Sequence, residues 1–214
     1  MSTLTKLVLG AMGALHPRPP VGDATATIEL PPPDLSGGAS LLEALGKRRS
    51  SREFRRDALP METLSTLLWA ADGVNRPDGG RTAPSALDAH EIDIVVALPS
   101  GAYRFDAPSH ALQLLCAQDL RRVTGYQDFV DDAPLDLVYV ADHGRMKMVP
   151  VSQREAFSNA AAGAIAQNVN LFAASAGLAT VLRAWVDREA IARSLGLSHD
   201  QQVLLSQTVG FAKA

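Results

Sequence analysis

The sequence is poor in cysteine and in long apolar runs, and each shortage excludes a class of structure. Its one cysteine, Cys116, cannot form an intrachain disulfide, so no part of the chain requires an oxidising compartment. The cysteine stands in the apolar stretch LQLLC, a setting that favours core packing over a reactive thiol. No apolar run approaches the roughly 20 residues that a membrane helix needs, so we expect no membrane span.

Several familiar catalytic motifs are also missing. The chain has no GxxxxGK[ST] phosphate loop, no GxGxxG after a strand, no HExxH and no paired cysteines at zinc spacing. It also lacks the GxSxG motif that presents a nucleophilic serine in many hydrolases. The histidines stand at positions 16, 90, 110, 143 and 199, far apart in the sequence, which disfavours a metal site. We therefore assign no catalytic residue and no metal ligand from the sequence.

What the sequence does contain is a local excess of positive charge. The formal net charge is −3, yet the stretch KRRSSREFRR, residues 47–56, holds six of the 20 lysines and arginines and a single acid. This leaves 14 basic against 22 acidic residues elsewhere, a balance that repels nucleic acid. The anion that meets this basic segment is therefore expected to be small.

The basic segment has two interpretations. Cations at the end of a helix complement its dipole and otherwise remain solvated, which is the state that we expect for Arg55 and Arg56. In the second interpretation Arg48, Ser50 and Arg52, which alternate where a helix gives way to extended chain, project donors from one side. Converging hydroxyl and guanidinium donors suit a phosphate or another anionic ligand rich in acceptors.

The N-terminal part of the chain has a different character from the rest. Lys6 precedes a short apolar run over 7–15, which is a weak match to a signal peptide because it has a single preceding lysine. We expect a cytoplasmic protein and keep export as the alternative. Residues 16–38 are rich in proline and glycine and predict an extended arm. The expected division is an apolar segment with a Pro-rich arm over 1–37, and one folded domain over 38–214.

Capping signals and periodicity predict helices and strands in mixed order. Ser40 and Glu43 form a capping box, a second helix begins at Pro60 and stops at Gly73, and an Ala-rich helix covers 155–176. Strand patterns cover 92–98, 102–105, 111–115, 135–141, 178–186 and 203–211. This order, which includes a hairpin, predicts an α+β fold with helices packed on a mainly antiparallel sheet.

Several of these stretches together resemble a known family. They are RRSSREF, then TAPSALDAHEIDIVV about 30 residues later, a helix of small residues, and a terminal VGFAK. In this order and spacing they resemble the FMN-dependent nitroreductase family, and most of all the branch that includes the dehydrogenases making thiazole and oxazole rings. The resemblance covers roughly Leu35 to Lys213.

The resemblance implies a nitroreductase-like α+β fold, an interlocked homodimer, and FMN bound at the subunit interface by both chains. The residues that match the flavin-binding motifs of the family are Arg48, Arg49, Ser50, Arg52, Pro84, Ser85, Ala86, Asp88, Leu182, Arg183, Ala184 and Lys213.

The resemblance also gives these residues roles. In the family the segment matching 48–52 holds the flavin phosphate, ribityl chain and pyrimidine edge, and the one matching 84–86 reaches the flavin of the partner subunit. Residues 182–184 fall where a strand-to-loop segment lies against the isoalloxazine near N5, and Lys213 adds a phosphate contact. Asp88 stands where the family often has Asn, a departure that matters because an ionised Asp cannot donate a hydrogen bond.

The implied activity is two-electron transfer by a bound flavin. NADH or NADPH would reduce the FMN and leave, and a small acceptor such as a nitroaromatic or a quinone would then be reduced. Arg52 is the candidate for stabilising negative charge near N1 and the C2 carbonyl of the flavin. Three alternatives stay open: dehydrogenation of an azoline or a similar peptide-derived ring, flavin binding without catalysis, and a solvated basic segment without any cofactor.

Two further segments are interpreted in the same frame. Ala160, Gly163 and Ala164 would let the Ala-rich helix approach its counterpart in a dimer core, and the alternative is the central helix of a monomer. Tyr126 and Phe129 lie in the polar stretch RRVTGYQDFVDD, which is a candidate cover for the exposed face of the flavin.

Overall fold

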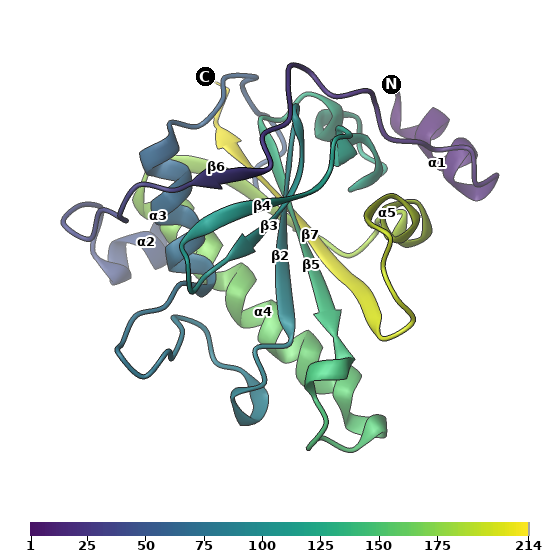
Figure 1. Cartoon of the computed structure of the whole chain (residues 1–214). Coiled ribbons are helices and arrows are strands. Elements are labelled where there is room, and N and C mark those ends of the chain that lie inside the picture. The colour runs from purple at the N-terminus through teal and green to yellow at the C-terminus, as the bar shows by residue number, and fades with distance from the viewer. Residues whose placement is uncertain (214) are drawn as a thin grey trace.

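A single sheet organises the computed structural model, which describes residues 1–213. Its seven strands lie in the order β1-β4-β3-β2-β5-β7-β6, and each neighbouring pair is antiparallel (Figure 1). The strands are β1 Thr27–Glu29, β2 Ile92–Leu98, β3 Gly101–Asp106, β4 Ala111–Cys116, β5 Leu135–Asp142, β6 Leu178–Arg183 and β7 Gln201–Phe211. The predicted α+β fold with an antiparallel sheet is confirmed.

Helices surround this sheet. The α-helices are α1 Thr3–Ala11, α2 Leu41–Lys47, α3 Met61–Asp72, α4 Val151–Ser175 and α5 Arg188–Leu195. The short 3₁₀ turns are η1 Ala86–Asp88, η2 Leu120–Val123, η3 Asp128–Asp131 and η4 His143–Arg145. Within residues 1–213, none of the helices combines the length and the apolar character that a membrane crossing needs.

The helix boundaries follow from local chemistry that the sequence displays. The hydroxyl of Ser40 accepts a hydrogen bond from the Glu43 amide at 3.3 Å and so begins α2. Helix α3 begins directly after Pro60 and ends before Gly73, as predicted. The Ala-rich helix is longer than expected, because α4 begins at Val151, directly after its N-cap residue Pro150 and four residues before the expected start at 155.

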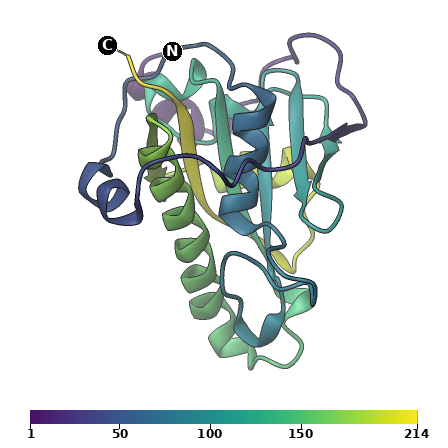
Figure 2. The same cartoon turned by 90° about the vertical axis from the view of Figure 1, so that its left-hand side faces the viewer.

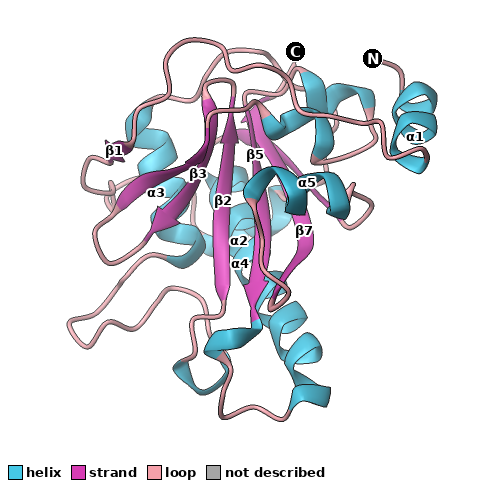
Figure 3. Ribbon diagram, turned by 45° about the vertical axis from the view of Figure 1, so that its right-hand side comes forward, coloured by secondary structure: helices cyan, strands magenta, loops and turns pink. Residues whose placement is uncertain are grey.

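The two faces of the sheet bury separate cores. On one face α3 and α4 pack with residues such as Leu67, Leu68 and Val169 against β2, β5 and β7. On the other face α5 and η2 pack with residues such as Ile191 and Leu120. Figure 3 shows α5 lying in front of β5 and β7, with α3 and α4 behind the sheet.

The Pro-rich arm is tied to the fold along much of its length. Residues 27–29 form β1, the edge strand beside β4. Farther on, the Ser65 hydroxyl donates to the carbonyl of Pro31, and the amide of Asp34 donates to the Thr66 hydroxyl at 3.0 Å. Figure 2 shows this arm crossing in front of α3. The predicted division of the chain at 37/38 stays a prediction, with a strand of the sheet on its N-terminal side.

A buried ion pair lies between β5, β6 and β7. The Arg183 guanidinium donates to the Asp136 carboxylate at 2.8 Å and to the Thr208 hydroxyl at 2.8 Å, and the same hydroxyl bonds Asp136. The side chains of Arg183 and Asp136 are 5% and 0% exposed. Burial raises the pKa of Asp136 and lowers that of Arg183, while their mutual attraction opposes both shifts. The pair is therefore held together by the cost of leaving either charge alone.

Replacing Arg183 by Met should lower the free energy of unfolding by about 3–5 kcal/mol, because Asp136 would keep a buried carboxylate without its cation. Urea unfolding at neutral pH measures this loss. The matched control is Arg56→Met, which breaks an exposed pair with Asp132 of the same 2.8 Å length and should cost at most about 1 kcal/mol. Equal losses in the two variants would contradict this assignment of the buried pair.

Candidate functional site

The basic segment lies along one edge of the sheet. The Ser51 amide donates to the Thr180 carbonyl of β6 at 2.9 Å, and the Arg55 amide donates to the Phe211 carbonyl of β7 at 2.9 Å. Lys213 closes the arrangement, because its amide donates to the carbonyl of Glu53 at 3.2 Å. The segment thus runs beside β6 and the end of β7, which fixes its backbone and brings Lys213 to the same place.

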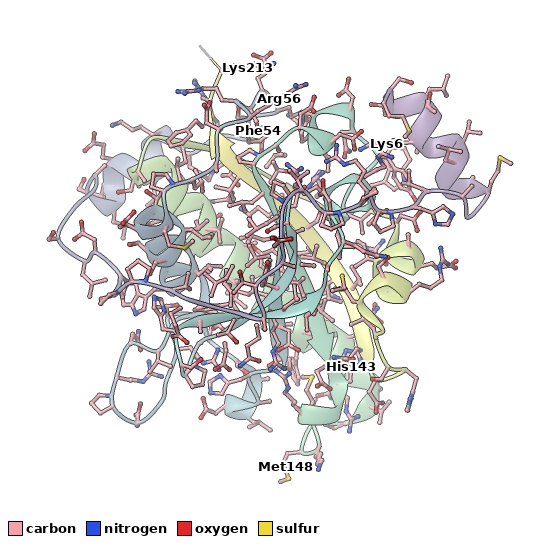
Figure 4. The ribbon with its side chains drawn as sticks, turned by 45° about the horizontal axis from the view of Figure 1, so that its top comes forward. Lys6, Phe54, Arg56, His143, Met148 and Lys213 are labelled. Atoms are coloured by element: carbon pink, nitrogen blue, oxygen red, sulfur yellow. The ribbon has the colours of Figure 1, made fainter. Side chains whose placement is uncertain are left out.

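One aromatic residue anchors the segment from inside. Phe54 is 5% exposed and packs with Ala133, Ala179 and Val181, and its ring centroid lies 5.6 Å from that of Phe129. Figure 4 shows Phe54 at the same end of the molecule as Arg56 and Lys213. Sequence reasoning missed this residue, although its signal was present: Phe54 is the one apolar side chain in a run of charged and polar residues. Its burial keeps the flanking arginines at the surface.

A cleft of about 440 Å³ opens beside this segment. Its walls come from the end of α2, the last turns of α4 and the first half of β6, and it is lined by Gly46, Lys47, Arg48, Arg49, Ser51, Asn170, Ala174, Gly177, Leu178, Ala179, Thr180 and Ala212. Ser51, rather than the predicted Ser50, is the serine of the cleft wall. Ser50 is exposed and forms an isolated bridge to Thr180.

Hydrogen bonds beneath the cleft make its floor rigid. The Gln207 amide nitrogen donates to the Asn170 side-chain oxygen at 2.9 Å and to the Thr180 hydroxyl at 3.1 Å, while its oxygen accepts from the Tyr139 hydroxyl at 2.6 Å. These contacts join α4, β5, β6 and β7. The polar groups of the floor therefore have defined positions.

The six cations of the basic segment fall into two groups. Three are paired, with nitrogen to oxygen distances of 2.6 to 2.8 Å: Lys47 with Glu43, Arg55 with Asp57, and Arg56 with Asp132. The other three, Arg48, Arg49 and Arg52, form no ion pair with any residue in 1–213. These three are exposed, and two of them line the cleft. The cations that can neutralise a bound anion are thus those that match the motif.

The end of β6 offers backbone donors beside the cleft. The carbonyl of Thr180 points to the outer edge of the sheet, where Ser51 bonds it, and alternation along a strand places the amide of Leu182 on that same edge. The amide of Ala184 has no backbone acceptor in the described part of the chain. Arg183 differs, because its side chain donates to Asp136 and the same alternation turns its backbone N–H and C=O toward β7, so Arg183 offers no donor at this edge.

The predicted segment 84–88 lies elsewhere. It lines no part of the cleft, and it leads into His90, whose carbonyl accepts from Arg145 of η4 at 2.9 Å. Figure 4 places His143 of the same turn at the end of the molecule opposite Phe54 and Lys213. Within one chain the two predicted halves of the site therefore do not meet.

Internal hydrogen bonds hold the segment 84–88 in an unusual shape. The Ser85 hydroxyl donates to the buried Glu91 carboxylate at 2.6 Å and accepts from the His90 amide at 2.8 Å. Leu87, Asp88 and His90 adopt left-handed backbone angles, with φ of 53°, 56° and 46°, which non-glycine residues rarely adopt. Ser85 therefore has no proton left to donate to a ligand, and its role is to shape the loop.

Asp88, at the end of this segment, is largely exposed. Its side chain is 78% exposed, and its carboxylate lies 3.1 Å from the ring nitrogen of His90. Burial lowers the pKa of His90, and the nearby Asp88 carboxylate opposes this shift. In residues 1–213 no group of three or more His, Cys, Asp or Glu side chains gathers in a way that suits a metal ion.

Comparison with known proteins places this geometry in context. A model of the nitroreductase family matches residues 45–211. A Methanocaldococcus jannaschii protein named "Putative nitroreductase MJ1384" is 31% identical over 174 residues, which cover 76% of this chain and 87% of that protein.

Solved structures agree with the family match. A crystal structure of a "putative nitroreductase" from Ralstonia eutropha JMP134 shares 53% identity, covers 94% of this chain and 96% of its own, and has a TM-score of 0.89. The Escherichia coli microcin synthetase McbBCD, solved with truncated pro-MccB17, matches 78% of this chain and 70% of its own, with a TM-score of 0.71. At 19% identity this second likeness concerns the fold alone. The family model covers residues 45–211, which is most of this chain, so the chain belongs to the nitroreductase family.

Proposed function

We propose that the protein is an FMN-dependent oxidoreductase that uses NADH or NADPH to reduce small electron-poor acceptors such as nitroaromatics or quinones. The observation that supports this most is the group of three unpaired arginines beside the cleft, next to the free backbone edge of β6. A ligand that carries a phosphate needs cations such as these arginines, and a flat ring rich in acceptors needs donors such as the backbone amides of β6.

The donor set of the cleft fits FMN. Arg48 and Arg49 can bind a phosphate through paired N–H groups. Lys213, which follows the end of β7, adds a further cation. Among residues 1–213, none of those that line the cleft carries a carboxylate side chain that would repel the phosphate. Its volume of about 440 Å³ is within the range of small-molecule sites. Phosphate and ribityl chain would thus occupy the end of the cleft near the basic segment.

The ring would lie along the end of β6. Leu182 is 36% exposed, and it shares the α4-facing side of the strand with Thr180. The amides of Leu182 and Ala184 are available as donors to the ring edge, and Arg52 can stabilise negative charge on its pyrimidine side. Bound FMN would accept hydride from the nicotinamide and pass two electrons to the acceptor. The chain would bind the flavin and orient it toward the nicotinamide and the acceptor, and no side chain has to act as acid or base.

A second copy of the chain would supply the rest of the site. Helix α2 exposes Leu41, Leu42 and Leu45 by 63%, 79% and 48%, an apolar surface next to the cleft that a single chain leaves uncovered. Helix α4 leaves Ala160 exposed, and apart from the helix's own neighbouring backbone no atom of residues 1–213 lies within 4 Å of a Cβ placed on Gly163. We propose that these surfaces pair in a homodimer, which brings the loop 84–88 of each chain to the flavin of the other.

The first prediction concerns the arginines. Replacing Arg48, Arg49 or Arg52 by Ala should weaken FMN binding by about 10- to 100-fold, since each loses a charge-assisted contact of roughly 1.5–3 kcal/mol. Fluorescence quenching of FMN on titration measures the dissociation constant. Arg55→Ala and Arg56→Ala are matched controls in the same segment, because their side chains pair with Asp57 and Asp132. Similar losses in controls and variants would contradict the assignment.

The second prediction concerns the reductant. Under anaerobic conditions NADH or NADPH should bleach the flavin absorbance of the FMN-loaded protein, and a nitroaromatic or a quinone should then restore it. Stopped-flow absorbance measures both half-reactions. Flavin that stays oxidised with both nicotinamides but is bleached by an azoline-containing peptide would replace the proposal with the dehydrogenase alternative. Flavin that no donor bleaches would indicate binding without catalysis.

The third prediction tests whether two chains build one site. Arg49→Ala impairs the basic segment, and Ala86→Glu would place a negative charge in the loop 84–88. Neither variant alone should bind FMN well. Mixed dimers contain one intact site, so refolding the two variants together should restore about a quarter of the wild-type sites if they assemble at random. A mixture that binds no more FMN than its components would contradict a site shared between chains.

A further inference from the structure

Helix α1 lies outside the region that the family model matches, which begins at residue 45, and it docks through a buried lysine. The Lys6 side chain is 0% exposed. Its ammonium donates to the backbone carbonyls of Arg122, Gly125 and Gln127 at 3.4, 3.3 and 3.0 Å, and it lies 2.7 Å from the Asp131 carboxylate. Figure 4 shows Lys6 on the side of α1 that faces the body of the molecule.

These contacts make Lys6 more than a packing residue. An ammonium group has three protons, and four oxygens of one short stretch surround them, three carbonyls and the Asp131 carboxylate, so the segment 122–131 must curve around the side chain. The Met1 amino group adds a second cation, 3.3 Å from Asp131. Burial lowers the pKa of Lys6, which Asp131 opposes. An apolar residue would fill this space without the cost of desolvation, but it would leave three carbonyls without the Lys6 donor and remove the cation nearest to Asp131.

The segment held by Lys6 reaches the end of β6 through two aromatic rings. The Tyr126 ring centroid lies 5.4 Å from that of Trp185, and the Phe129 ring lies 5.6 Å from the guanidinium carbon of Arg183. These contacts fall on the two residues that flank Ala184. The rings thus support the strand-to-loop segment 183–185 rather than cover an open face of the cleft.

A glycine of α1 completes the chain of contacts. A Cβ built on Gly10 would come within 2.5 Å of Cε1 of Tyr126, so the ring of Tyr126 rests directly on the helix backbone. Any side chain at this position would push the ring away. Helix α1 therefore fixes Tyr126 in two independent ways: Lys6 binds the segment 122–131 that carries Tyr126, and the Tyr126 ring contacts Gly10 directly. Trp185 is 58% exposed.

We propose that α1 is a positioning element for the flavin site, with Lys6 and Gly10 as its positioning residues. Through Tyr126 and Phe129 it sets the place of 183–185, and so the direction of the Ala184 amide and the Trp185 ring. The effect of α1 on FMN rests on the proposed function, but the effect of α1 on the position of residues 183–185 does not require a flavin. It assigns to the N-terminal helix a role in ligand binding, in addition to its contribution to the fold.

The experiment compares two variants with one control in a Trp69→Phe background, where Trp185 is the only tryptophan. Lys6→Met removes the ammonium, and Gly10→Ala displaces Tyr126 while raising helix propensity. The control is Val8→Ala, on the exposed face of α1. Circular dichroism and thermal unfolding establish that each variant is folded. If Lys6→Met does not fold, Gly10→Ala still decides the question, because it removes no charge.

The first measurement needs no flavin. Iodide quenching and the emission maximum of Trp185 should change in Lys6→Met and Gly10→Ala, because Tyr126 no longer backs the indole, and should stay at the parent value in Val8→Ala. Unchanged Trp185 emission in both folded variants would overturn the inference. This result stands whatever FMN does, so it is distinct from a failure of the proposed function, which would appear as absent FMN binding in the parent protein.

The second measurement uses the FMN-loaded protein. The dissociation constant of FMN should rise by about 2- to 30-fold in both variants, the range seen for positions that act on a ligand without touching it. The reduction rate by nicotinamide at saturation should fall as well, since the Ala184 amide is displaced. If Trp185 emission changes while FMN affinity and reduction rate match those of Val8→Ala, α1 is structural only and the proposal is overturned.

Discussion

The attachment of the basic segment to the edge of β6 is the constraint on which the site depends. Phe54 is buried under the segment, and backbone hydrogen bonds from Ser51 and Arg55 fix it on either side. With the backbone held in this way, the arginines before Phe54 have to project outward. Those that follow it find carboxylate partners, and those that precede it do not. A short charged stretch thereby becomes one wall of a cleft with uncompensated positive charge.

Much of the fold was predictable because local signals agree with the tertiary structure. The capping serine at 40, the proline at 60 and the glycine at 73 mark helix ends by their own stereochemistry, and short, nearly continuous apolar runs mark β2 and β5. The strand β1 was not predictable. Its three residues lie among prolines and glycines. They form a strand because the edge of β4 is available to pair with them, and this pairing joins segments far apart in the sequence.

The sequence could predict which residues belong to the candidate site, but not which partners their side chains bind. The sequence shows six cations in ten residues, and the partners of Lys47 and Arg55 lie only four and two positions away. It cannot show that Arg56 is neutralised as well, because Arg56 pairs with Asp132, 76 positions away. Arg183 was expected at the flavin, and the strand turns its side chain inward to Asp136. Ser85 was expected to bind a ligand, and its proton is used by Glu91. For Arg56 and Arg183 a partner far away in the sequence decides what the side chain does, and for Ser85 the folding of its own loop brings Glu91 to it.

The central claim is that the unpaired arginines of one chain and the loop 84–88 of a second chain bind the same flavin. A crystal structure of the protein with FMN tests it most directly. The account predicts the FMN phosphate within hydrogen-bond distance of Arg48 or Arg49, the ring along 182–184, and residues 84–86 of a second copy against the ring. A phosphate bound away from the basic segment, or a ring contacted by one chain alone, would contradict the account.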